Sequence, residues 1–458
     1  MNTNRTAYFK KRKERVFGIM VYFMTSIFPI IVQAQDTRPI TLKKAIDLSI
    51  QNSKQLQASS ARNEEAAGAL KEAQDRKLPD VNVSGSYLRL TNPNIALKTN
   101  AFSGGSDSTG KNTSPTVNQA MYGIVNVALP IYAGGRIRYG VESARYLQQA
   151  TMLDAEHDKE AVILNTINAY INLYKAGATV NVVKENLQQS AHQDSVFSRL
   201  EQNGLLARND LLKSQLQTSN IELSLLDAEN NRKIANVNMT LMLGLPETTT
   251  LIPDSSKFEE ALSIKNLAEY ETLAMQNRKD VLALKFRQKA ATTGIAATKA
   301  EMYPSVALTG GYIAADIPHV LSIYNAVTVG VGLKYNIGSL WKTKAKVDQA
   351  MAREKEIVAN EAQLDDAIRL KINQDYENFL LSQKKINVYE KAVAQATENY
   401  RITKNKYDVS LVNTTDLLDA NVSLLQSKIN LAVAKADVVL AYNRLLATSG
   451  LLSAEPNN

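Results

Sequence analysis

The chain has 458 residues, of which 45% are hydrophobic, and carries a formal net charge of +8. It contains no cysteine, which excludes disulfides, thiolate metal sites, a cysteine nucleophile and a lipid-modified N-terminal cysteine. The three histidines, His157, His192 and His319, lack the spacing of metal ligands. We therefore predict no catalytic residue, no cofactor and no metal site.

Residues 1–34 carry the features of a secretory signal peptide. Six basic residues within the first 15 positions precede an apolar stretch at 16–31, which is too short for a membrane span. Val32-Gln33-Ala34 has the small-x-small pattern of a cleavage site, so we expect a mature chain that begins at Gln35; an uncleaved anchor is the alternative. Cleavage leaves 47 basic and 44 acidic residues, a net charge of +3, so the basic total gives no support for nucleic-acid binding.

The first half of the mature chain is predicted to be helix, strand, loop, strand and helical hairpin. Positions 42–78 form a helix that ends at Pro79, and alternating residues over about 80–90 indicate a strand. The polar positions 91–120 predict a loop, and a second strand follows at about 121–132. A proline-free stretch then begins a helical hairpin at about 136–244, whose first helix would be about 100 Å long at 1.5 Å per residue.

The second half repeats this order. Positions 46–87 match positions 271–312 at a shift of 225, and later positions match at a shift of 206, as Asp210 and Asp416 do. We therefore predict two repeats, 35–246 and 266–452, with a linker at 247–265 and a tail at 453–458. The second repeat holds strands at about 304–314 and 326–336 and a hairpin at about 342–449. Its returning helix has the 4-3 apolar spacing of a coiled coil, through Leu418, Val422, Leu425, Ile429, Ala432, Ala436, Val439, Asn443 and Leu446.

The four strands are long enough to cross a bilayer when they are tilted, and aromatic residues lie near their ends. Ordinary soluble strands are the alternative. Four strands cannot close a barrel, and an open sheet edge has no hydrogen-bonding partner in lipid. A membrane barrel would therefore be shared between chains, and three chains would supply 12 strands.

Three features together resemble the TolC family of outer-membrane efflux proteins: the duplication, the run Leu-Pro-Ile-Tyr-Ala-Gly-Gly-Arg at 129–136, and the helix-turn segments 204–212 and 407–420. The resemblance implies a mainly α fold with a small membrane β part, in duplicated helix-strand-strand-helix-helix halves. It also implies a trimer in which a 12-strand β-barrel continues into a long α-helical coiled-coil tunnel.

In function, the resemblance implies the passive exit duct of a tripartite efflux or type I secretion system, which conducts small molecules or polypeptides from the periplasmic pump assembly to the exterior. The duct would lie in the lipid of the Gram-negative outer membrane. Its partners would be a periplasmic adaptor and an inner-membrane transporter of the RND, ABC or MFS type.

The resemblance places the two helix–helix turns at a periplasmic tip that docks the adaptor, through Gly204, Leu205, Leu206, Val409, Ser410 and Leu411. Gly204 suits a left-handed turn, whereas Ser410 stands where family members usually have a second glycine.

The same comparison places a gate at the tip. Asp416 and Asp419 would face the pore and form acidic rings that bind cations, and Tyr407 would pair with Asp210 to hold the inner coiled coil closed. Helix capping is the alternative for both aspartates at helix starts, Asp416 and Asp210. Val412 stands where the family often has a basic residue that links chains.

Two other functions are the alternatives. A periplasmic coiled-coil adaptor or scaffold without a channel has one helical hairpin flanked by β domains, whereas this chain has two hairpins and four strands. A secreted enzyme is opposed by the lack of a nucleophile set or metal cluster in the sequence.

Overall fold

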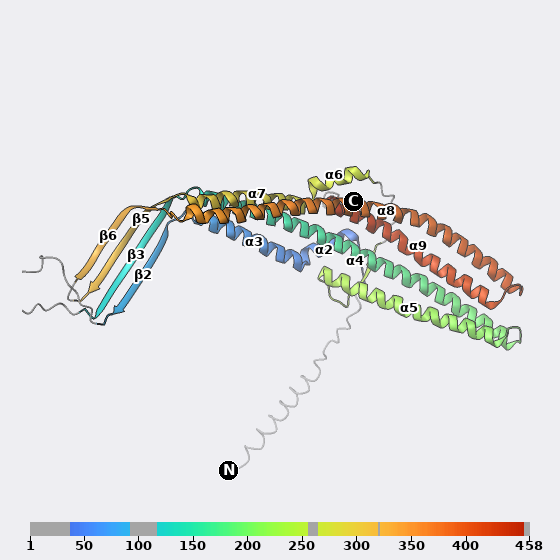
Figure 1. Cartoon of the computed structure of the whole chain (residues 1–458). Helices are drawn as coiled ribbons and strands as arrows, with labels where there is room; N and C mark the ends of the chain where they lie inside the picture. Colours follow the sequence, from blue (N-terminus) through green and yellow to red (C-terminus); the bar gives the residue numbers. More distant parts are fainter. Residues whose placement is uncertain (1–36, 92–116, 255–263, 319–320, 453–458) are drawn as a thin grey trace, which may run out of the picture.

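The computed structural model describes residues 37–91, 117–254, 264–318 and 321–452. The predicted signal peptide, most of the predicted loop and the predicted tail lie outside these residues. The described chain is elongated, with a β-sheet at one end and the turns of two long helical hairpins at the other (Figure 1).

The two repeats have the same order of elements. In the first repeat these are α2 (Leu42–Asn52), α3 (Lys54–Asp75), β2 (Asp80–Arg89), β3 (Gln119–Tyr132), α4 (Arg136–Gln202) and α5 (Arg208–Leu243). In the second they are α6 (Leu267–Asn277), α7 (Lys279–Lys299), β5 (Ser305–Ile317), β6 (Leu321–Lys334), α8 (Ser339–Asp408) and α9 (Thr414–Thr448), with a 3₁₀ turn at Ala300–Met302 before β5. The 67 residues of α4 and 70 of α8 span about 100 Å each.

The single helix predicted over 42–78 is wrong, because the chain bends at Ser53 between α2 and α3. Ser53 has extended backbone angles, and its hydroxyl accepts a hydrogen bond from the Leu56 amide, which caps α3. Arg278 makes the equivalent bend between α6 and α7.

A short parallel pair of strands was not predicted. β1 (Thr37–Ile40) pairs with β4 (Thr250–Pro253), which lies inside the predicted linker. The buried hydroxyl of Tyr170 on α4 donates to the carbonyls of Ile40 and Asp254, at 2.9 and 3.0 Å. Burial raises the pKa of Tyr170 to about 12, so this anchor stays protonated at ordinary pH.

The other four strands form an antiparallel sheet in the order β2-β3-β5-β6. Paired residues share a face, so, apart from the paired Ile124 and Ile313, the register places most of the large apolar residues of the four strands on one side. These include Val81, Val83, Val125, Val127, Leu129, Val306, Leu308, Val327, Val329, Val331 and Leu333. The opposite side carries small and polar residues, among them Asn82, Ser84, Ser86, Asn126, Thr309, Thr328, Gly330 and Gly332.

The core lies in the middle of the long axis, where α4 and α9 cross the shorter helices. Ile163, Ile167 and Ile171 of α4 pack with Ala436 and Leu440 of α9. Because α9 contacts both α4 and α8, its buried residues extend beyond the predicted coiled-coil seam. The buried residues off the seam include Leu417, Ala420, Leu424, Val438, Leu440, Ala441 and Leu445, while Val422 on the seam is 42% exposed.

Candidate functional site

The two hairpin turns have the same backbone conformation. Gly204 has φ +72°, and the amide of the next residue, Leu205, donates to the Leu200 carbonyl at 2.8 Å. Ser410 has φ +60°, and the Leu411 amide donates to the Lys406 carbonyl at 2.9 Å. Both helices therefore end in a left-handed residue that satisfies their last carbonyl groups, although only one of the two is glycine.

Both turns project apolar side chains into solvent. Leu205 and Leu411 occupy matching positions and are 75% and 73% exposed, and Val409 is also exposed. Leu206 is half-buried and packs inward. The predicted docking residues thus lie together at one end of the molecule, which Figure 1 shows farthest from the sheet.

An apolar cluster joins the two hairpins behind their turns. Phe197 of α4, Leu211 of α5 and Leu417 of α9 are buried together. The ring of Tyr407 on α8 packs on that of Phe197, with 5.3 Å between the ring centroids. This cluster therefore links the two tips.

The structure gives Tyr407 a different hydrogen-bond partner from the one we expected. Its hydroxyl lies 3.4 Å from the Thr414 hydroxyl, while Asp210 forms an ion pair with Lys213 at 3.2 Å. Burial raises the pKa of Tyr407, and the nearby charge of Asp210 adds to this effect. Asp210 is thus close enough to act on Tyr407 electrostatically, but prefers the cation one turn along its own helix.

Asp416 takes part in a capping box at the start of α9. The Asp416 amide donates to the Asn413 side chain at 2.9 Å, and the Asn413 amide donates to the Asp416 carboxylate at 3.3 Å. The cap residue is therefore Asn413, and Asp416 closes the motif from the third helical position. Asp416 and Asp419 are both exposed, one turn apart on the same helix.

Polar contacts that the sequence analysis missed connect the hairpins above the tip. Asn186 of α4 donates to Asn421 of α9 at 2.9 Å, and both side chains are buried. Gln189 donates to the Tyr400 hydroxyl at 2.6 Å. In the sequence, the only sign of these contacts is an asparagine within an otherwise apolar helix face. A buried asparagine at such a position often fixes the register of two packed helices.

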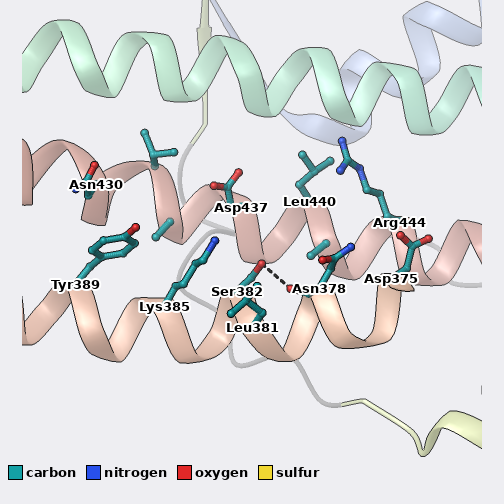
Figure 2. Close-up of a pocket in the computed structure, with 13 residues that line it drawn as sticks. Asp375, Asn378, Leu381, Ser382, Lys385, Tyr389, Asn430, Asp437, Leu440 and Arg444 are labelled. Carbon is teal, nitrogen blue, oxygen red and sulfur yellow. Dashed lines mark hydrogen bonds between the residues drawn. The ribbon is translucent and has the colours of Figure 1, made fainter. Parts of the chain in front are cut away.

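A polar cleft of about 360 Å³ lies between α8 and α9, nearer the middle of the molecule. Figure 2 shows Lys385, Asp437 and Arg444 among its lining side chains. Its buried carboxylate, Asp375, accepts hydrogen bonds from Thr448 at 2.6 Å and Lys371 at 3.1 Å. Asp437 pairs with Lys175 of α4. Asp375 therefore links α8 to α9 through Thr448, and Asp437 links α9 to α4 through Lys175.

Two other features, a metal site and a membrane-spanning helix, are absent from the same described residues. No group of three or more His, Asp or Glu side chains there could hold a metal ion. No described helix has the combination of length and hydropathy needed to cross a membrane.

Comparison with known families decides the identity. The family model described as outer membrane efflux protein matches residues 45–245 and 272–451, one match for each repeat. The chain belongs to the outer membrane efflux protein family. The predicted resemblance and the predicted role as an outer-membrane efflux channel are therefore confirmed, and the adaptor alternative is removed.

Relatives of the efflux family match along most of the chain. The outer membrane efflux protein BepC of Brucella suis is 21% identical over 408 residues, covering 87% of this chain and 88% of that protein. The alkaline protease secretion protein AprF of Pseudomonas aeruginosa is 23% identical over 301 residues, covering 64% of this chain and 62% of that protein.

A solved structure shows the same fold. The outer membrane protein VceC of Vibrio cholerae superposes with a TM-score of 0.72 at 20% identity, covering 89% of this chain and 96% of that one. At this identity the likeness shows the fold alone.

Proposed function

We propose that three copies of this efflux protein form the exit duct of a tripartite efflux or type I secretion assembly, with a 12-stranded barrel in the outer membrane and a helical tunnel across the periplasm. The observation that carries the proposal is the sidedness of the sheet. One face of all four strands is mainly apolar and the other is mainly small and polar, which is the pattern of a barrel wall between lipid and a watery interior.

The edges of the sheet support a shared barrel. Within the described chain β2 and β6 each pair on one side only, so both edges present unpaired backbone groups. Such edges cannot face hydrocarbon, because an unsatisfied N–H or C=O group there costs several kcal/mol. Pairing β2 of one copy with β6 of the next would satisfy both edges.

The helical part has two matching apolar edges. α5 and α8 lie on opposite sides of the α4–α9 pair (Figure 1), and each carries a lengthwise stripe of exposed apolar residues. On α5 the stripe is Leu212, Leu216, Leu223, Leu226, Ile234 and Leu241, each more than half exposed. On α8 it is Leu370, Leu381, Val388 and Ile402, which recur at whole numbers of helical turns. Two different edges that fit each other head to tail generate a ring.

The tips would then serve two roles. Leu205, Val409 and Leu411 are exposed apolar side chains that no element of the described residues covers, and they would dock a periplasmic adaptor bound to an inner-membrane transporter. Asp416 and Asp419 would form acidic rings at the tunnel mouth, and the Tyr407 cluster would hold that mouth narrow.

In this proposal, the partner pump determines which cargo the duct conducts. One relative, AprF, is named for the secretion of an alkaline protease, so a duct of this family serves protein export in that case. Most of the polar face carries small, uncharged side chains, with Asp80 and Lys334 at the end nearer the helices, so it suits cargo of varied chemistry.

Two measurements test the proposal together. Native mass spectrometry of the detergent-purified protein should give the mass of three chains that begin at Gln35, and planar bilayers should show stepwise conductance. A stable monomer, or a trimer that never conducts, would contradict it.

A further inference from the structure

Four basic residues lie where the sheet joins the long helices. The shift of 206 matches Arg136 with Lys342 and Arg138 with Lys344, so each repeat supplies the same two basic positions. All four are exposed, and none has an ion-pair partner within the described residues. Positions 131–141 and 331–347 contain no acidic residue. Glu142 and Asp348 follow one helical turn after Arg138 and Lys344 without forming an ion pair with them, and Glu301 is bound by Lys346 at 2.7 Å.

In the proposed barrel, the two positions would lie on opposite sides of the wall. Arg136 lines a groove in which most of the sheet residues, among them Ala128 and Ala307, belong to the polar face, while Tyr132 and Val306 belong to the apolar face. Arg138 follows two residues later, about 200° around the same helix, so it lies on the side of the apolar face. The register between the repeats gives Lys344 the outward position and Lys342 the inward one.

Aromatic residues border the outward pair. Tyr335 continues the alternation of the apolar face two residues beyond Leu333. Trp341 is 64% exposed and lies three residues before Lys344, which places both on one side of α8. An apolar band that ends in Tyr and Trp and then in basic side chains has the composition of a membrane interface.

We propose that Arg138 and Lys344 bind the phosphate-bearing head groups of acidic phospholipids in the membrane leaflet nearer the helical tunnel. This inference rests on the proposed function, since it takes the apolar face of the sheet to lie in lipid. Trp341 and Tyr335 would lie at the boundary between hydrocarbon and head groups. The two outward charges recur in every copy around the barrel, so the collar would fix the depth of the duct and enrich one class of lipid around it.

Trp341 provides a local probe, because it is the only tryptophan of the chain. The trimer would be reconstituted in phosphatidylcholine vesicles that contain a minor share of phosphatidylglycerol. One of the two lipids at a time would carry brominated acyl chains, which quench the fluorescence of Trp341. Each basic group near an anionic surface favours it about five-fold. Brominated phosphatidylglycerol should therefore quench as though it were enriched about five-fold around Trp341.

The chain offers a matched control. Arg138→Gln with Lys344→Gln should return quenching to the bulk lipid composition, whereas Arg136→Gln with Lys342→Gln removes the same charge on the inward side and should leave the enrichment intact. Two results would overturn the lipid site without contradicting the proposed duct. One is quenching by each brominated lipid in proportion to its bulk share in the unaltered protein, and the other is an equal loss of phosphatidylglycerol enrichment in both double variants. An absence of quenching by either lipid would overturn the membrane placement itself and the proposed function with it.

Discussion

The Ser410 turn offers a test of how the second tip is built. A non-glycine residue in the left-handed region costs roughly 1 kcal/mol relative to glycine. Ser410 has φ +60° where the matching residue of the first tip, Gly204, has φ +72°. Ser410→Gly should therefore stabilise the closed turn by about 1 kcal/mol, which lowers its opening equilibrium about five-fold.

Hydrogen exchange of the native protein measures this opening directly, because the Leu411 amide is bonded across the turn at 2.9 Å. Its exchange should slow about five-fold in Ser410→Gly. Gly204→Ser is the matched control, since a Cβ at Gly204 would meet no atom within 4 Å and the change acts through the backbone alone. It should speed exchange at Leu205 by a similar factor. Unchanged exchange in both variants would refute the reasoning.

Three further outcomes are expected. Asp416→Asn with Asp419→Asn retains a capping oxygen but removes the acidic rings, so single-channel conductance should rise and block by divalent cations should weaken; unaltered values would leave both residues as helix-start residues only. Tyr407→Phe keeps the ring packing but loses the hydroxyl contact, so amides of the tip should exchange up to about five-fold faster. Burial would raise the pKa of Asp280, but the hydrogen bonds and charge of Arg278 lower it. The resulting stabilisation is present above about pH 4 and lost as pH falls through the lower folded pKa. The gap in unfolding temperature between the unaltered protein and Asp280→Asn should therefore narrow from pH 7 toward pH 3.

The internal duplication made the order of the long elements predictable. Pro79 and Pro304 mark where helix gives way to strand, and period-2 alternation identifies all four strands of the sheet. The proline-free stretches likewise identify α4 and α8, since nothing in them interrupts a helix.

Features set by distant contacts were not predictable in the same way. β1 and β4 have four residues each and pair across most of the first repeat, so neither has a pattern of its own. The bends at Ser53 and Arg278 fall within continuous helical periodicity. At the tip, the partner of Tyr407 depends on which side chain of the neighbouring helices reaches its hydroxyl, and spacing along one chain does not determine that.

Pairing between β2 of one copy and β6 of another is the most direct test of the shared barrel. Within one chain these strands are three strand spacings apart, about 14 Å, far beyond the reach of a disulfide. The chain has no cysteine, so Ser84→Cys can be combined in turn with Thr328→Cys, Gly330→Cys and Gly332→Cys on the same polar face. Oxidation should give a covalent ladder that ends at the trimer in at least one combination, and no product with Val329→Cys on the apolar face. Failure of every polar-face combination to link separate chains in the conducting protein would contradict a barrel closed between copies.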